Sequence, residues 1–251
     1  MAALTNALQA LGARAKQTVM RQPNAVKALH NAVRDAVEHQ ASELTKPGRQ
    51  IDALLNAMSA VDAAALGIQE YKGACTYLGI VEHADYAIAT FVLAPGARIP
   101  LHDHPGMTVL SKLLFGRLRV TSYDAPPPVP AEPRSAGLGA AWSRALRRAP
   151  SRRRLSARPP EVRTVAGGPA SEVLRLEPLR GNLHCFEALE HTAIFDVLTP
   201  PYNHGADRPC RYYEVGERGA ADSGEVELLE VGWPDSLSIV NLPYSGVRLR
   251  L

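Results

Sequence analysis

The chain of 251 residues is 46% hydrophobic and 21% charged, with a formal net charge of +3. This composition is that of an ordinary globular protein, and the length suits one large domain or one domain with an extension. The sequence contains no run of about 18 apolar residues, which excludes a membrane-spanning helix. Its three cysteines show no Cys-x-x-Cys spacing, which argues against a disulfide scaffold and for a reducing compartment.

The positive charge is concentrated in one segment. Residues 125–163 hold nine arginines and two glutamates and so carry +7, which leaves −4 for the rest of a chain whose total is +3. The basic balance therefore says little about the folded surface. We expect no nucleic-acid partner and no membrane partner.

Helices are predicted from the start of the chain to about residue 65. Apolar residues recur at helical spacing in three stretches, 4–11, 26–37 and 51–58. Pro23 separates the first two stretches, and a turn that Asp62 initiates should end near Gly67. We therefore expect residues 1–70 to form an N-terminal helical extension.

The start of the chain is basic and has no acidic residue before Asp35, so it resembles an organelle transit peptide in composition. The alternative is a helical flank that packs on the core, since the apolar spacing continues past the point where a presequence should end. With that alternative, we expect the protein in the cytoplasm, the nucleus or both.

From Cys75 onward the apolar pattern is that of strands, with β-branched and aromatic runs between turns. Strands are predicted at 76–81, 86–93, the stretch after Gly96, 109–114, 118–123, 171–176, 181–188, 192–198, 212–215 and 226–231. Short strands at regular spacing without interleaved helices predict an antiparallel sandwich or barrel.

Two segments interrupt this rhythm. Residues 125 to about 168 are too polar and too rich in proline to bury, which predicts a disordered or loosely attached insertion. A docking arm or an import-like basic tract is the functional alternative to a tolerated surface insertion. The tail from Trp233 onward is predicted to be irregular.

Residues 96–107 contain the first candidate for chemistry. His102 and His104 stand at positions i and i+2, which point to one face of a strand because strand side chains alternate. Two imidazoles on one face can share a metal ion, whereas a surface turn is the alternative for an isolated pair. Pro100 and Pro105 stiffen the backbone on either side.

His184 is the third candidate ligand. It opens a strand in the second half of the β region, as His102 and His104 open one in the first, and a barrel can bring the two halves face to face. The spacings Gly-x5-His-x-His and Gly181-x-x-His184 resemble the paired motifs of the cupin superfamily. This resemblance implies a mainly β fold over residues 71–251, a cupin jelly-roll (double-stranded β-helix) barrel that holds one metal ion.

Two positions depart from the cupin pattern. The usual glutamate would fall near Val109 and is absent, and the usual asparagine is replaced by Ala188. Three neutral histidines leave Fe(II) with its full charge and about three open positions, so a thiolate with a neighbouring amine can chelate it beside O2. A structural zinc site would need a fourth protein ligand, and a zinc or manganese cupin isomerase generally needs a carboxylate.

Five longer motifs resemble, in the same order, the family of plant cysteine oxidases and animal 2-aminoethanethiol (cysteamine) dioxygenases. They are residues 99–107, 182–184, 195–198, 200–202 and 210–213. The similarity spans about residues 75–231 without the arginine-rich insertion. The segments 108–116 and 120–124 are more similar to the plant branch than to the animal branch.

The resemblance implies an enzyme that adds both atoms of O2 to the N-terminal cysteine of a protein, giving cysteine sulfinic acid. It implies Fe(II) as cofactor, O2 as co-substrate and a role as oxygen sensor in the N-degron pathway. Cysteamine dioxygenase is the alternative activity, and a non-catalytic cupin binding module is an alternative of another class. The expected partners are proteins with an exposed N-terminal cysteine or small aminothiols, and we expect a monomer.

The resemblance also implies the roles of the residues around the metal. His102, His104 and His184 should bind Fe(II). Asp103, between the first two, should point away from the metal, where Arg98 is expected to meet either this carboxylate or the substrate.

Four further residues match family positions near the iron. Asp196 should orient the substrate amine or accept its proton, or else cap a turn. Tyr202 should line the pocket mouth and donate a hydrogen bond to the bound oxygen or peptide, or else pack in the core. Cys210 and Tyr212 stand where animal members can form a thioether crosslink, whereas plant-type members keep both side chains free.

Overall fold

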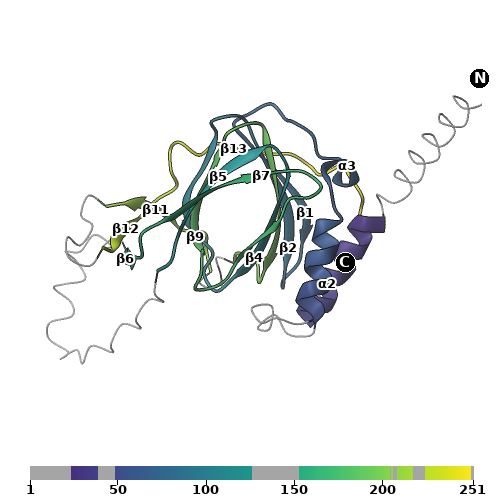
Figure 1. Cartoon of the computed structure of the whole chain (residues 1–251), viewed down its shortest axis with the longest axis horizontal. Helices are drawn as coiled ribbons and strands as arrows, with labels where there is room; N and C mark the ends of the chain where they lie inside the picture. The colour runs from purple at the N-terminus through teal and green to yellow at the C-terminus, as the bar shows by residue number, and fades with distance from the viewer. Residues whose placement is uncertain are drawn as a thin grey trace, which may run out of the picture.

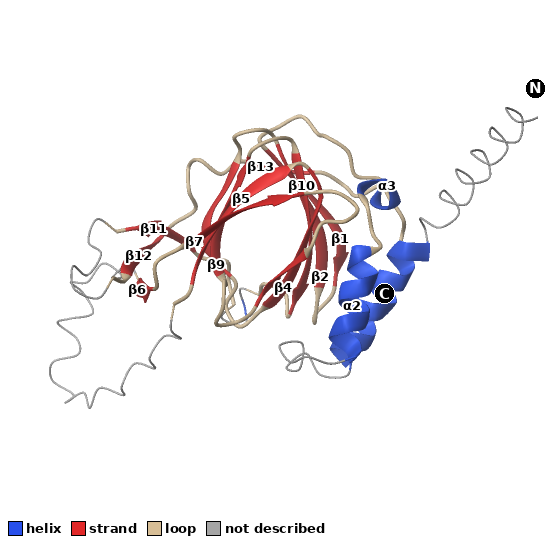
Figure 2. Ribbon diagram, in the orientation of Figure 1, coloured by secondary structure: helices blue, strands red, loops and turns tan. Residues whose placement is uncertain are grey.

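The structure, a computed structural model, describes residues 24–38, 49–125, 153–203, 205, 208–216 and 224–249. Two β-sheets face each other and enclose a barrel, and helices lie against one side of it (Figure 1). Figure 2 shows these helices together on the outside of strands β1 and β2. The predicted mainly β barrel with an N-terminal helical part is confirmed. Within the described residues, no helix is long and apolar enough to cross a membrane.

The six-stranded sheet has the spatial order β13-β1-β2-β10-β4-β8. Its strands are β1 (Cys75–Glu82), β2 (Ala87–Leu93), β4 (Thr108–Phe115), β8 (Val173–Leu176), β10 (Thr192–Thr199) and β13 (Ile239–Asn241). The seven-stranded sheet has the order β6-β12-β11-β3-β9-β5-β7. Its strands are β3 (Arg98–Asp103), β5 (Arg117–Tyr123), β6 (Arg154–Ala157), β7 (Glu161–Ala166), β9 (Leu183–Ala188), β11 (Tyr212–Val215) and β12 (Val226–Val231).

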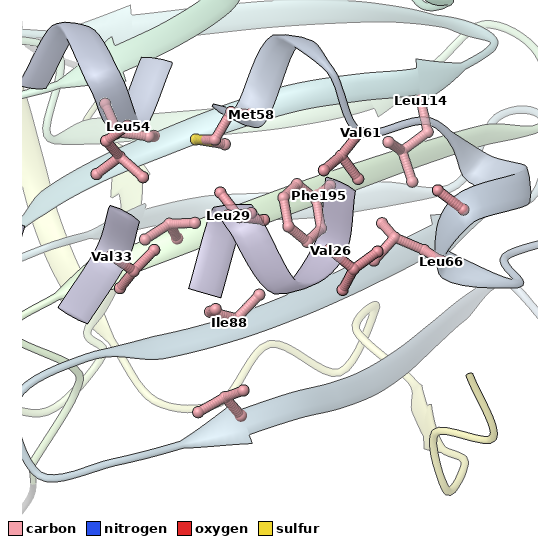
Figure 3. Close-up of a cluster of buried hydrophobic side chains, with 14 of the residues drawn as sticks. Val26, Leu29, Val33, Leu54, Met58, Val61, Leu66, Ile88, Leu114 and Phe195 are labelled. Carbon is pink, nitrogen blue, oxygen red and sulfur yellow. The ribbon is translucent and has the colours of Figure 1, made fainter. Parts of the chain in front are cut away.

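One hydrophobic cluster joins the helices to the six-stranded sheet. The helices are residues 24–38, α2 (Arg49–Ser59) and α3 (Ala63–Leu66). The buried side chains of the cluster include Val26, Leu29, Val33, Leu54, Met58, Ile88, Leu114 and Phe195 (Figure 3). Full burial of a side chain of this size contributes about 1.5–3 kcal/mol, so the apolar faces predicted for residues 26–37 and 51–58 hold the helices on the sheet. The predicted helical stretch 4–11 lies outside the described residues.

A buried lysine fixes the end of α2 to the barrel. Lys112 of β4 donates from Nζ to the carbonyl oxygens of Ser59 and Val61, both at 2.7 Å. These carbonyls lie where a helix end lacks its own donors, and a cation there also complements the helix dipole. Asp62 then caps α3 by accepting a backbone N–H at 2.7 Å, and Gly67 ends it with a φ of 67°, as predicted.

Two predictions of irregular structure are wrong in part. Within residues 125–168, β6 pairs with β12, and β7 pairs with β5 over six residues. This pairing satisfies the backbone while most side chains of β6 and β7 stay outside the core, so composition gave no sign of it. In the C-terminal tail, the three residues of β13 pair in parallel with β1, and the other described residues from Trp233 onward are irregular, as predicted. Residues 126–152 of the predicted insertion lie outside the described residues.

Candidate metal centre

Two neighbouring strands of the seven-stranded sheet supply the three histidines. His102 of β3 is paired directly with His184 of β9, and His104 immediately follows β3. One ring nitrogen from each histidine lies within 4.8 Å of those of the other two, and all three residues are buried. The two halves of the β region thus meet side by side in one sheet, and not face to face across the barrel as expected.

The rings of His102 and His184 are each held through Nδ1. Nδ1 of His102 lies 2.8 Å from the carbonyl oxygen of Pro100, and Nδ1 of His184 lies 3.3 Å from that of Gly181. A carbonyl oxygen only accepts, so both rings carry their proton on Nδ1. The Nε2 lone pair of each ring is then free for a metal ion.

The ring of His104 is held by a tyrosine. The hydroxyl of Tyr202 donates to the carbonyl oxygen of Asp103 at 2.7 Å and lies 2.8 Å from Nδ1 of His104. Because its only proton goes to the carbonyl, the hydroxyl accepts from Nδ1–H of His104. Outer partners of this kind fix the orientation of a metal-binding histidine and raise its basicity.

Burial keeps the three imidazoles neutral. Loss of hydration lowers the pKa of His102 to about 4 and holds the pKa values of His104 and His184 well below their usual range. For the latter two, repulsion from neighbouring histidines adds to this effect. The neutral imidazole is the form that binds metal ions.

The donor set fits a transition-metal ion. Two nitrogens that each bind one ion at about 2.1 Å lie at most about 4.2 Å apart. The nitrogens of the three histidines lie within 4.8 Å of one another, so they exceed this spacing by less than about an ångström. In the described part of the chain, the group that can hold a metal ion consists of three histidines without a carboxylate or a thiolate. Imidazole ligands suit iron, copper, nickel and zinc.

The histidines line a cavity of about 640 Å³ inside the barrel. The six-stranded sheet contributes Tyr77, Ser111 and Asp196 to the lining, and the segment between β10 and β11 contributes Tyr202 and Cys210. The cavity therefore places the candidate metal centre of one sheet within the same space as an acidic group of the other.

Asp196 is a buried carboxylate with an unused hydrogen-bonding atom. Burial raises its pKa to about 7, although a hydrogen bond from Ser111 acts in the opposite direction. Its Oδ1 has no hydrogen-bond partner among the described residues. A buried, half-satisfied carboxyl group is suited to receive a cationic group such as an ammonium.

Tyr202, Cys210 and Tyr212 lie together at the cavity. The thiol of Cys210 is in hydrogen-bonding contact with the hydroxyls of both tyrosines, and burial raises its pKa to about 11, so it is a neutral thiol near pH 7. The ring of Tyr212 lies 6.2 Å from that of His102, centroid to centroid. Tyr202 was expected to donate a hydrogen bond to the bound oxygen or peptide. Its hydroxyl instead donates its proton to the carbonyl oxygen of Asp103.

Asp103 points away from the three histidines, as expected. It accepts from the backbone N–H of Arg211 at 2.9 Å and from the hydroxyl of Tyr213 at 3.0 Å. Of the two partners expected for Arg98, the carboxylate of Asp103 is not in contact with it, because Arg98 donates to Glu187 at 3.0 Å on an exposed part of the sheet. The pairing of β3 with β9 places Arg98 beside Glu187. The sequence around Asp103 gives no indication of this contact.

Sequence reasoning gave no site role to several residues that line the cavity, among them Tyr77, Ser111, Phe186 and Trp233. Phe186 had a signal, since it stands two residues after His184 on one strand and therefore shares its face. Its ring stacks on that of His184 at a centroid distance of 4.4 Å. Tyr77 and Ser111 enter through the pairing of strands that are distant in sequence, which no local pattern reveals.

This topology and this cluster define a cupin barrel with a histidine group able to hold a metal ion. The profile of the PCO_ADO family matches residues 34–249. The chain belongs to the PCO_ADO family, and the resemblance seen in its five motifs is confirmed.

Named relatives are thiol-oxidising enzymes. The human 2-aminoethanethiol dioxygenase is 34% identical over 199 residues, covering 69% of this chain and 68% of that protein. Plant cysteine oxidase 2 of Arabidopsis thaliana is 35% identical over 187 residues, covering 70% of this chain and 61% of that protein. A cupin protein from Desulfovibrio desulfuricans is 13% identical, with a TM-score of 0.33, covering 53% of this chain and 90% of that chain. The family is thus one of thiol dioxygenases.

Proposed function

We propose that this protein is an Fe(II)-dependent dioxygenase that converts the N-terminal cysteine of target proteins to cysteine sulfinic acid with O2. The observation that carries the proposal lies in one cavity. Among the described residues, it combines three neutral histidines that have no carboxylate beside them as a ligand with a buried carboxylate, Asp196, whose Oδ1 has no hydrogen-bond partner. The first can hold the metal ion, and the second can receive the amine of an aminothiol.

His102, His104 and His184 would hold the iron through their Nε2 atoms. Iron with three neutral protein ligands keeps its charge and open positions, which supplies O2 activation and a partner for a thiolate. The protein contributes the orientation of each ring, through the carbonyl and tyrosine partners of Nδ1.

Asp196 would bind the α-ammonium group of the substrate. A carboxyl group whose pKa is about 7 loses its proton readily when a cation comes beside it, because the opposite charge favours the ionised form. Oδ1 is the atom that would accept the ammonium hydrogen bond. The same oxygen can take up a proton from the amine.

Tyr202, Cys210 and Tyr212 would shape the space around the bound thiol. The hydroxyl of Tyr202 keeps its place through two hydrogen bonds, and the neutral Cys210 does not compete as a thiolate ligand. The two alternatives for Cys210 and Tyr212, a thioether crosslink or free side chains, differ in mass, since the crosslinked protein would be lighter by two hydrogens.

Oxidation of an N-terminal cysteine would make the protein an oxygen sensor of the N-degron pathway in the cytoplasm or nucleus. The alternative substrate is cysteamine, which carries the same thiol and amine and is the substrate in the name of the human relative. Both substrates use the same two features of the cavity, so the choice between them depends on what lies at its mouth.

The test is a mass spectrum of a Cys-initiating peptide after incubation with O2 and the iron-loaded protein. We expect the peptide to gain two oxygen atoms. An unchanged peptide beside oxidised cysteamine would favour the alternative, and no oxidation of either thiol would refute the dioxygenase proposal. Protein that never retains iron would support a non-catalytic cupin module.

The metal assignment has its own test. Replacing His184 with alanine should abolish iron retention, measured as iron bound per chain after desalting, because two imidazoles remain where three are needed. His191→Ala is the matched control, since that histidine lies outside the cavity. Wild-type iron content in the His184 variant would remove this residue from the site.

A further inference from the structure

Trp233 is a large apolar side chain that lines the cavity and yet stays 61% exposed. Its indole N–H donates to the carbonyl oxygen of Leu237 at 3.0 Å. Its ring meets that of Tyr212 edge to face, with centroids 5.4 Å apart and an interplanar angle of 68°. An indole that is exposed and already held in place loses little freedom when a ligand covers it, which is typical of aromatic anchors in binding sites.

A line of rings leads from the candidate metal centre to Trp233. The centroid of His102 lies 6.2 Å from that of Tyr212, which in turn lies 5.4 Å from that of Trp233. An extended peptide advances about 3.3 Å per residue, so each of these distances corresponds to about two residues. A peptide whose first residue lies at His102 would bring its third to fifth residues to Trp233. A free aminothiol such as cysteamine would not reach it.

Strand β13 adds a free backbone edge at the same cavity. It is the outermost strand of the six-stranded sheet, and Leu242 N, just beyond it, donates to Tyr77 O of β1 at 3.0 Å. Backbone groups alternate in direction along a strand, so those of Ile239 and Asn241 point away from β1. Among the strands that the structure describes, none pairs with this edge. Ile239 and Asn241 line the cavity.

We infer that Trp233 and the free edge of β13 form a subsite for the residues that follow the cysteine of a peptide substrate. The inference rests on the proposed function and names the substrate class of the same site. An extended chain that leaves the cavity passes a strand edge whose N–H and C=O groups can pair with it in any sequence. The indole adds apolar contact with a side chain of that peptide. Both contacts favour a peptide over cysteamine, because the small thiol lacks the parts that they hold.

The enzymatic test compares two thiols on full-length, iron-loaded protein. For Trp233→Ala, the ratio of kcat/KM for a long Cys-initiating peptide to kcat/KM for cysteamine should fall about tenfold, equivalent to about 1.4 kcal/mol. Leu179→Ala removes a side chain of similar exposure, 60%, that lies outside the cavity lining, and should leave the ratio unchanged. An unchanged ratio in the Trp233 variant would overturn the inference.

A binding test needs neither iron nor turnover. The chain has two tryptophans, so Trp142→Phe leaves Trp233 as the only one. A long peptide that begins with serine should change its fluorescence emission, whereas a serine dipeptide should not. Backbone N-methylation of the long peptide should weaken binding at every second residue, as pairing with one strand edge requires. Absence of both the emission change and the alternation would refute the subsite.

These readouts separate the two proposals. If no thiol is oxidised but the serine peptide binds with the expected alternation, the dioxygenase proposal fails and the subsite stands. If peptide and cysteamine are both oxidised and the Trp233 variant treats them as the wild type does, the subsite fails and the dioxygenase proposal stands. If Trp233→Ala instead turns a dimer into a monomer in sedimentation, the surface is an interface between copies of the chain and the inference is overturned.

Discussion

Replacing Asp196 with asparagine should stabilise the metal-free protein, and the gain should grow with pH. Burial raises the pKa of this carboxyl from 3.8 to about 7. An acid with a raised pKa in the fold binds its proton more tightly there than in the unfolded chain. Its contribution to stability is therefore full below pH 3.8, decreases as the pH rises, and is lost above about pH 7. At about 1.36 kcal/mol per pKa unit, the ionised group costs the fold about 4 kcal/mol.

The assay is urea unfolding of chelator-treated protein between about pH 4 and about pH 9. The stability difference between Asp196→Asn and wild type should rise from a small value at the acid end to about 4 kcal/mol above about pH 7, or roughly 10 °C in Tm. Asp235→Asn, which changes an exposed carboxylate, should show no such rise. Parallel stability curves for wild type and the Asp196 variant would refute the reasoning.

Three further variants test the other contacts. Lys112→Met removes the donor for two carbonyls at the end of α2 and should lower the free energy of unfolding by about 1–3 kcal/mol, whereas the exposed Lys72→Met should not. Tyr202→Phe removes the acceptor that orients one metal-site imidazole and should weaken metal binding, measured by titration, about 10–100-fold. Gly116→Ala sets a Cβ against a backbone carbonyl, whereas the Cβ of Gly96→Ala meets no atom of the described residues within 4 Å. Thermal unfolding should therefore show a loss above about 3 kcal/mol for the first and about 1–2 kcal/mol for the second.

The parts of the site that could be predicted depend on short-range geometry. The i, i+2 spacing of His102 and His104 and the glycine turn before His184 are properties of a few consecutive residues, as is the cap at Asp62. Such features depend only on the conformation of the local backbone, so they can be predicted from the sequence of a short segment. The motif resemblance then supplied the family and four further residues at the cavity: Asp196, Tyr202, Cys210 and Tyr212.

The parts that could not be predicted depend on pairing between distant segments. Strand β7 forms because β5 offers it a ladder, although its own side chains are mostly exposed. Ser111 reaches Asp196 because β4 and β10 pair in one register, and Arg98 meets Glu187 because β3 pairs with β9. Composition and periodicity describe a segment by itself, so they are silent on these partners.

His102 and His184 are direct partners in the ladder between β3 and β9. A slip of one residue in this ladder would turn one of the two rings to the opposite side of the sheet. A metal ion bound by both rings would link the two strands and fix their register. Metal binding should then stabilise the closed barrel further, with hydrogen exchange of both strands slowing together when the ion is added.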